Sequence, residues 1–332
     1  MSKSNYARLT LVIVCLLALA ACREEAPQNL PVASAPLTPT PLSTPLPAVP
    51  TLIPAGAEGN PIRLVVRPRG PAADARNATA DVEASILEQS GLSVQVEIVE
   101  RYAEALAALC DSAGGQVSAA WLDAPTYMAA RAQNCGIPVL QIEQGTRQDA
   151  RSGEAGLIIV AQDSSIRDVR GLDGRTFCRL GYDDFYSWLA PSLVMRANGL
   201  DPVSAPEAVV DYADVPELIE AVAGGDCDAA GIAESALEEY AGALGDVVDS
   251  ITALATTTSF PYGVLVMPDE IPLGVRLSLT ETLQAMSEDN VEAVKLRALL
   301  AQSALVSATA DDFTEMVDFM DSTGLDFALL GG

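Results

Sequence analysis

Histidine is absent from this chain of 332 residues. Its absence excludes Ser-His-Asp and Cys-His catalysis and removes the commonest protein ligand of zinc and copper. Basic residues are scarce, with 19 lysines and arginines against 45 aspartates and glutamates, so the formal net charge is -26. A protein of this charge repels nucleic acids and anionic membrane surfaces. The composition therefore argues against an enzyme and a nucleic-acid-binding protein, and we expect no cofactor or metal.

Long apolar runs are also scarce, and the one near the N-terminus, Leu9 to Ala21, is too short to span a bilayer, which needs about 20 residues. Lys3 and Arg8 precede it, and small residues lead from it into Cys22. This pattern is typical of a bacterial lipoprotein signal; a plain signal peptide or an anchor helix is the alternative. The sequence predicts a signal peptide over residues 1–21, lipidation of Cys22, and an extracytoplasmic protein anchored by lipid to the cell membrane.

Charge is missing altogether from Ala26 to Ala57, where many prolines stand among Thr, Ser, Leu and Ala. Such a segment cannot bury a core and favours an extended, polyproline-like spacer. At about 3.1 Å per residue it would reach up to roughly 100 Å from the membrane. Residues 22–59 are therefore predicted to be the lipidated cysteine and a disordered Pro/Thr-rich tether.

Beyond residue 59, short β-rich runs alternate with helical stretches, which favours an α/β architecture with parallel strands. About 270 residues of this pattern exceed a typical single domain, so we expect two lobes. The predicted strands are Ile62–Val66, Ser93–Val99, Val117–Leu122, Ile137–Ile142, Ala155–Ala161, Arg175–Leu180, Asp228–Ile232 and Pro261–Met267. The predicted helices are Ala78–Ser90, Ala103–Leu109, Thr126–Gln133, Pro191–Asn198, Pro216–Ala223, Arg276–Met286, Asn290–Ala301 and Asp311–Thr323.

Six cysteines are present, of which Cys15 would leave with the signal and Cys22 would carry lipid. The other four lie far apart without a C-x-x-C pair, and an even number in an oxidising compartment favours two disulfides over a metal site. Three pairings are possible, and four free thiols are the alternative. We favour Cys110 with Cys135 and Cys178 with Cys227, because each pair would join neighbouring segments of one lobe.

Short motifs spread over most of the chain carry a family resemblance through their order and spacing. They are Arg101-Tyr102-Ala103-Glu104-Ala105-Leu106, Ser118-Ala119-Ala120-Trp121-Leu122-Asp123-Ala124-Pro125, Ile158-Ile159-Val160, Asp163-Ser164-Ser165-Ile166, Leu172-Asp173-Gly174-Arg175-Thr176-Phe177, Pro191-Ser192-Leu193-Val194, Gly225-Asp226-Cys227-Asp228-Ala229-Ala230-Gly231 and Phe260-Pro261-Tyr262. From Ile62 to beyond Pro272 the chain resembles the periplasmic phosphate-, phosphite- and phosphonate-binding proteins.

The resemblance implies a type II periplasmic-binding-protein fold, in which two α/β lobes are joined by two crossover strands and enclose a ligand cleft. Lobe I would combine residues 60–155 with 256–332, and lobe II would be residues 156–255. The implied partners are a small-molecule solute and an ABC permease in the membrane, and a monomer is expected. Hinge closure on a small solute suits this architecture.

The resemblance is weaker at the positions that bind ligand in the family. Family members hold phosphonate oxygens with a Ser-Thr-Ser run at the start of a second-lobe helix, where this chain has Asp184, Phe185 and Tyr186, and only Ser187 survives nearby. A second anion contact, usually a Ser-His pair, becomes Asp214-Val215. Carboxylates repel a phosphonate at close range, so the prediction is a cationic, amine or polar neutral solute. In the alternative interpretation, Asp183 and Asp184 are only turn and N-cap residues.

Other candidates come from position. Tyr102 matches a family position that contacts ligand, and Asp123 directly follows a strand, where open α/β sheets place ligand groups. Trp121 is expected in the core. Arg67 and Arg69 could neutralise an anionic ligand group, although exposed arginines are usually solvated. The predicted ligand-binding set is Tyr102, Asp123, Asp184, Tyr186, Ser187, Asp214 and Tyr262.

Three functions follow from these patterns. The main hypothesis is an extracytoplasmic solute-binding lipoprotein of an ABC importer, with no chemistry of its own. The alternative is a membrane-tethered ligand sensor or interaction module on the same fold. Neighbouring genes for a permease and an ATPase would favour the main hypothesis, and a neighbouring kinase or cyclase gene would favour the alternative. A third, an enzyme on this scaffold, would require the histidine that the chain lacks.

Overall fold

The computed structural model describes residues 53–112, 116–146 and 148–329. The chain divides into residues 1–51 and 52–332, and every described residue belongs to the second unit. The predicted signal peptide, the lipidation site Cys22 and most of the tether therefore lie outside the described residues. None of the described helices combines the length and the apolar composition that crossing a bilayer requires.

The first of two sheets has six strands in the order β11-β4-β10-β3-β1-β2. β1 is parallel to β2 and β3, whereas β10 runs antiparallel to both β3 and β4, and β11 is antiparallel to β4. The expectation of parallel strands therefore fails for β10 and β11, which run opposite to the other four strands because the chain re-enters the sheet through β10 from the opposite direction. The strands are β1 (Ile62–Val66), β2 (Val94–Ile98), β3 (Ser118–Leu122), β4 (Ile137–Glu143), β10 (Val264–Met267) and β11 (Ala304–Ser307).

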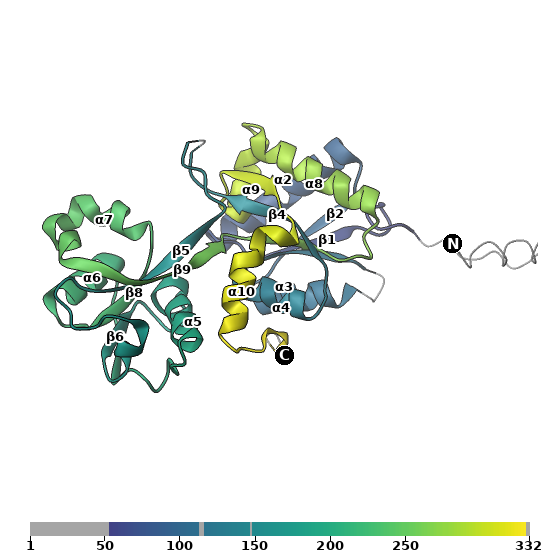
Figure 1. The fold of residues 1–332 in the computed structure, drawn as a ribbon. Coiled ribbons are helices and arrows are strands. Elements are labelled where there is room, and N and C mark those ends of the chain that lie inside the picture. Colours follow the sequence, from purple (N-terminus) through teal and green to yellow (C-terminus); the bar gives the residue numbers. More distant parts are fainter. Residues whose placement is uncertain (1–52, 113–115, 147, 330–332) are drawn as a thin grey trace, which may run out of the picture. The chain divides into compact units, whose positions relative to one another are not determined.

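Helices cover both faces of this sheet (Figure 1). Ile62, Leu64 and Val66 of β1 pack in one core with α2, α8 and α9, while Val65 packs in a second core with α3, α4 and α10. Burial on both faces explains why β1 is almost continuously apolar rather than alternating. The helices are α2 (Ala72–Ser90), α3 (Tyr102–Cys110), α4 (Ala124–Ala132), α8 (Leu273–Glu288), α9 (Glu292–Leu300) and α10 (Thr314–Ser322).

The second sheet has five strands in the order β7-β6-β8-β5-β9. β6 is parallel to β7 and β8, and β5 is antiparallel to β8 and β9. Its two cores contain α6 and α7 on one side and α5 with Trp188 on the other. The elements are β5 (Gly153–Ala161), β6 (Thr176–Arg179), α5 (Ala190–Ala197), β7 (Ala208–Asp211), α6 (Val215–Gly224), β8 (Ala229–Ala233), α7 (Ala236–Leu244) and β9 (Ile251–Pro261).

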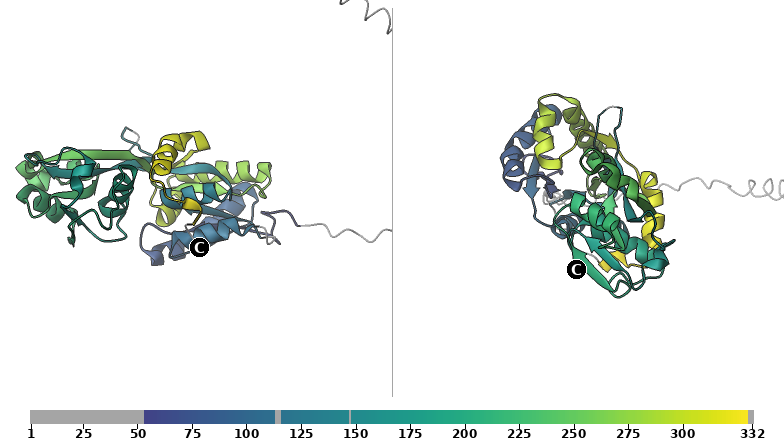
Figure 2. Two further views of the ribbon diagram at one scale, coloured as in Figure 1. Left: turned by 60° about the horizontal axis from the view of Figure 1, so that its bottom comes forward. Right: turned by 90° about the vertical axis from the view of Figure 1, so that its left-hand side faces the viewer.

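Two chain crossings join the sheets, from β4 into β5 and from β9 into β10. β5 and β9 pair along most of their length, and Figures 1 and 2 show this pair leading from the teal and green elements toward the six-stranded sheet. We call the part built on the six-stranded sheet lobe I and the part built on the five-stranded sheet lobe II. The lobe boundaries given above by residue number stay a prediction.

Each lobe contains one disulfide. Cys110 at the end of α3 is bonded to Cys135 beyond α4, and Cys178 in β6 is bonded to Cys227 ahead of β8. The two predicted disulfides and their favoured pairing are confirmed. With sequence separations of 25 and 49 residues, the loop-entropy model gives about 3.5 and about 4 kcal/mol of stabilisation through the unfolded chain.

Candidate ligand-binding cleft

The carboxyl ends of β1 and β3 open onto a cavity of ≈ 640 Å³. Arg67 follows β1 and Asp123 follows β3, while lobe II contributes Asp183, Phe185 and Tyr186, so that both sheets supply the lining. A cavity of this size accommodates a small molecule. Ligands of open α/β sheets bind outside the carboxyl ends of strands, so this cleft is the candidate site.

The starts of two helices place Tyr102 and Asp123 in the cleft. Tyr102 is the first residue of α3, and Asp123 is the N-cap of α4, whose carboxylate accepts a hydrogen bond from the Thr126 N–H at 3.0 Å. Burial raises the pKa of Asp123, and this effect outweighs the Thr126 hydrogen bond and the charges of Arg67 and Arg69, which act in the opposite direction. The Asp123 carboxylate is therefore held in place by α4 and lies within reach of both guanidinium charges.

Two arginines of the loop after β1 stack on tyrosines of the cleft. The guanidinium of Arg67 lies 4.9 Å from the ring centroid of Tyr102, and that of Arg69 lies 5.6 Å from the ring centroid of Tyr262. Arg67 Nε also donates to the Glu100 carbonyl at 3.0 Å, and Arg69 Nη1 donates to the Tyr262 carbonyl. Stacking and backbone hydrogen bonds together fix these two guanidinium groups at the cleft.

The three tyrosines of the cleft are neutral hydrogen-bonding groups. Burial is the main cause that raises the pKa of Tyr102, Tyr186 and Tyr262. The negative charge of Asp123 adds to this effect at Tyr102, and the charge of Glu154 adds to it at the other two. Each phenol therefore keeps its proton at neutral pH and can donate a hydrogen bond to a ligand.

Formal charge in the cleft is mixed rather than acidic. Three arginines and three acidic residues line it, namely Arg67, Arg69, Arg101, Glu100, Asp123 and Asp183. Arg101 is already paired with Glu104 of the same helix turn. The whole chain carries more than two acidic residues for each basic one, so the cleft is richer in positive charge than the rest of the protein.

Three of the predicted site residues do not line the cleft. Asp184 is the N-cap of the π-helix η3 (Phe185–Leu189) and accepts a hydrogen bond from the Ser187 N–H at 2.7 Å. The Ser187 hydroxyl is buried and accepts from the Leu180 N–H at 3.0 Å. Asp214 is exposed and is the N-cap of α6, where it accepts from the Glu217 N–H at 2.9 Å. Both aspartates thus serve as N-caps.

The structure brings the other four predicted residues, Tyr102, Asp123, Tyr186 and Tyr262, to the same cavity. It adds Arg101, Asp183, Phe185 and Phe260 as lining residues that the predicted set omitted. Trp121 is in the core as expected, with 3% of its surface exposed. Arg67 directly follows a buried strand, so the rule that selects Asp123 also predicts Arg67 as a ligand-binding residue.

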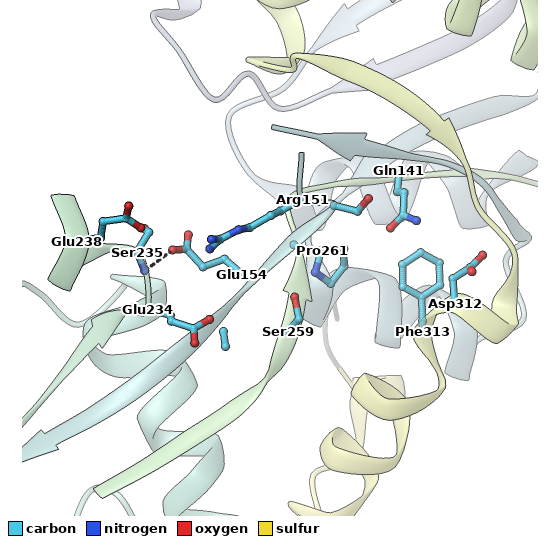
Figure 3. A pocket seen from close by; sticks show the side chains of 13 residues that line it. Gln141, Arg151, Glu154, Glu234, Ser235, Glu238, Ser259, Pro261, Asp312 and Phe313 are labelled. Carbon is cyan, nitrogen blue, oxygen red and sulfur yellow. Dashed lines mark hydrogen bonds between the residues drawn. The ribbon is translucent and has the colours of Figure 1, made fainter. Parts of the chain in front are cut away.

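A second cavity, of ≈ 720 Å³, lies beside the strands that join the lobes (Figure 3). It is strongly acidic, since Glu154, Glu234, Glu238 and Asp312 line it with Arg151 as the only basic residue among those described. Glu154 accepts a hydrogen bond from the Ser235 N–H at 2.9 Å and so connects β5 to the start of α7. None of the predicted ligand-binding residues lines this cavity.

No group of three or more Cys, Asp or Glu side chains within the described residues is placed to hold a metal ion. The side chains that line the cleft supply guanidinium, carboxylate, phenol and aromatic groups. These groups bind and orient a solute by charge, hydrogen bonds and stacking.

Comparison with known proteins places the fold and the family. A family model described as "ABC transporter, phosphonate, periplasmic substrate-binding protein" matches residues 64–313. A search of curated proteins gave no match. Among solved structures, XAC2383 from Xanthomonas citri bound to ATP is similar, with 13% identity over 79% of this chain and 97% of that chain and a TM-score of 0.58.

The same Xanthomonas citri protein bound to chloride ion gives a TM-score of 0.57, again at 13% identity over 79% of this chain and 97% of that one. A binding protein component of an ABC phosphonate transporter from Pseudomonas aeruginosa is 15% identical over 82% of this chain and 87% of that chain, with a TM-score of 0.49. At such low identity the two Xanthomonas citri structures establish the fold alone.

The predicted resemblance and the type II periplasmic-binding fold are both confirmed. The matching family consists of transport proteins that bind solutes outside the cytoplasm and work with an ABC permease, and it is not a family of enzymes. The chain belongs to the family of periplasmic substrate-binding proteins of phosphonate-type ABC transporters.

Proposed function

We propose that this protein is the solute-binding lipoprotein of an ABC importer, which captures a small solute in the cleft between its two lobes and delivers it to the permease as a monomer. The observation that carries the proposal is the cavity at the carboxyl ends of β1 and β3, lined from lobe I by Tyr102 and Asp123 and from lobe II by Tyr186. A solute that contacts both lobes favours the closed arrangement, because closure adds contacts that only the bound form makes.

We further propose that the solute is not held as a phosphonate by the second-lobe helix. Asp184 already accepts the N–H of Ser187 at the start of η3, and the Ser187 hydroxyl is engaged with Leu180. The Asp184 carboxylate thus occupies the helix start that an incoming anion would need. The prediction of a cationic or neutral solute depends on Asp184 and Asp214. Neither residue lines the cleft, so the charge of the solute is better inferred from the arginines that do.

The lipid anchor is part of the proposal. Cys22 would hold the protein at the membrane, and the proline-rich tether would let the binding unit reach the permease. Fractionation of cells that express Cys22→Ser tests this part. The variant should appear in the soluble fraction, whereas a variant that stays with the membrane would contradict lipid anchoring.

A thermal-shift titration of the full chain tests solute capture. The probes are methylphosphonate, inorganic phosphate, succinate and choline. A solute that binds the folded protein stabilises it by about 2.7 kcal/mol at a hundredfold excess over its dissociation constant, so the melting temperature should keep rising with the logarithm of the solute concentration.

Tyr102→Ala in lobe I and Tyr186→Ala in lobe II should each weaken that stabilisation. Tyr182→Ala is the matched control, because Tyr182 is 71% exposed and does not line the cleft. The proposal would be contradicted by probes that bind equally well to the wild type and to both cleft variants.

A further inference from the structure

The cleft adjoins a narrow recess that shares four lining residues with it. Arg67, Arg69, Tyr102 and Tyr262 line both, and the recess adds Trp121. The remaining residues described around the recess are apolar or glycine, so every polar side chain there carries an N–H or O–H donor. Among the described residues no carboxylate lines this recess.

The two arginines have charge available for a ligand. Arg67 donates to the Glu100 carbonyl and Arg69 to the Tyr262 carbonyl, both of which are neutral backbone groups. Neither guanidinium belongs to one of the salt bridges formed within the described part of the chain. The charges of both arginines act to lower the pKa of Asp123, so its carboxylate offsets part of their positive charge. One carboxylate cannot neutralise two guanidinium groups.

Trp121 supplies a third donor to the recess, and unlike the two arginines it has no acceptor among the described residues. Its side chain is 3% exposed, and its indole N–H has no hydrogen-bond partner among the described residues. A buried donor without a partner lowers stability, and native proteins usually satisfy such groups. The recess has a volume of ≈ 10 Å³, about that of one water molecule, so a single oxygen atom of a solute in the cleft could enter it and accept this N–H.

Lobe II does not offer an equivalent anion site in the cleft. The start of η3 is neutralised by Asp184, and Asp183 next to it is the carboxylate that lobe II adds to the lining. Lobe I supplies the three arginines of the lining together with Glu100 and Asp123, so the positive charge of the cleft comes from lobe I.

We propose that an oxyanion group of the solute, a carboxylate, phosphonate or phosphate, binds lobe I between Arg67 and Arg69 and accepts the indole N–H of Trp121. The inference rests on the proposed function, that the cleft binds a solute. It reverses the arrangement implied by the family resemblance, in which a second-lobe helix holds the anion. The rest of the solute then faces Tyr186 and Asp183 of lobe II.

Calorimetric titration of the full chain with methylphosphonate, inorganic phosphate, succinate and, separately, choline tests the assignment. At least one of the three anions should bind. Arg67→Gln and Arg69→Gln each remove a charged donor and should weaken that anion by about tenfold to a hundredfold. Arg76→Gln is the matched control: it removes the same charge from the exposed face of α2, and the affinity should stay within about twofold.

Trp121→Phe removes the indole N–H and keeps one aromatic ring in the core. The anion should bind the folded variant several-fold more weakly, while the cavity left by the smaller ring should lower the melting temperature without ligand, so the affinity is measured below that temperature. An anion that binds all four variants with wild-type affinity would overturn the inference.

Failure of the inference and failure of the proposed function give different results. Binding of choline with no anion bound would overturn the oxyanion assignment and leave solute capture intact. If none of the three anions binds at millimolar concentration, the oxyanion assignment is also overturned. The proposed function itself is contradicted only if no probe binds Tyr102→Ala or Tyr186→Ala more weakly than it binds the wild type.

Discussion

Asp123 shows how one side chain can serve both the fold and the site. Its carboxylate satisfies a free N–H at the start of α4, which is what an N-cap does, and the same position at the end of β3 brings it to the cleft. Burial in that position disfavours the charged form and raises its pKa. A group placed for binding is therefore held there at some loss of stability.

Asp123→Asn should be more stable than the wild type at pH 7. A carboxyl whose pKa is raised by folding binds a proton more tightly in the native state, so the protein loses stability as the pH rises from about 4. Asparagine does not titrate and is an equally good N-cap. Thermal denaturation from pH 4 to pH 8 should show the advantage of the variant shrink as the pH falls.

Asp168→Asn is the matched control, because Asp168 is an exposed N-cap that accepts from the Gly171 N–H at 3.1 Å. Its effect should be small at every pH. A destabilised Asp123→Asn at pH 7 would mean that the charged form of Asp123 is favoured in the folded protein, contrary to the argument from burial.

The sequence can predict where a side chain lies when its position at the end of a strand decides this. Asp123 was identified because the carboxyl end of a strand faces the ligand side of a sheet, and the structure places it in the cleft. Asp184 and Asp214 were selected by alignment, which gives a position but not the direction of a side chain. Each aspartate precedes a helix by one residue and turns back to cap it, which is the competing local interaction.

At the scale of secondary structure, Gly231 in β8 determines where η3 can lie. A Cβ at this position would come within 2.6 Å of the Tyr186 carbonyl oxygen and 2.7 Å of the Ser187 carbonyl oxygen, and would also collide with the Pro191 ring. Only glycine allows this approach of two backbones. The approach positions Tyr186 against the cleft, so a residue outside the cavity controls one that lines it.

Gly231→Ala should lower the free energy of unfolding by about 1–3 kcal/mol, the usual range for overpacking. It should also weaken solute binding, because η3 must move to make room for the methyl group and Tyr186 moves with it. Gly242→Ala in α7 is the control, since no heavy atom lies within 4 Å of the added carbon and alanine favours a helix by up to about 1 kcal/mol. Equal stabilities of the two variants would contradict this packing argument.

The elements missed from the sequence share a weak apolar pattern. All four residues of β7 are exposed, and α7 buries only its first and last residues, so neither shows the spacing on which sequence interpretation depends. β9 combines a threonine run with irregular burial, because it twists past β5 with shifts in register. By contrast, β1, β3 and β5 are each largely buried and contain an apolar run, and they were predicted within two residues of their bounds.

At the scale of the whole molecule, the acidic surface and the mixed cleft act against each other. The chain carries a net charge of -26, which repels an approaching anion over distances longer than the cleft. The arginines of lobe I attract it only at short range. The negative surface charge attracts cations, so it favours the first encounter with a cationic solute. The arginines of lobe I favour the bound state of an oxyanion.

The same charge should make the stability of the protein depend on salt. At about 0.01 M ionic strength the Debye length is roughly 30 Å, so carboxylates across the whole unit repel one another, and at about 0.15 M it falls to roughly 8 Å. The melting temperature should therefore rise between these two concentrations of NaCl. Sucrose at matched osmolality is the control, because it leaves charge interactions unscreened.

Screening also weakens favourable ion pairs, which sets the size of the opposing effect. In five of the six described salt bridges, such as Arg101 with Glu104, at least one partner is exposed, and pairs of this kind contribute at most about 1 kcal/mol each. With 45 acidic and 19 basic residues, most acidic residues have no basic counterpart, so relief of repulsion should prevail. A melting temperature that falls with NaCl would show instead that the ion pairs dominate and that the excess acidic residues are too widely spaced to repel.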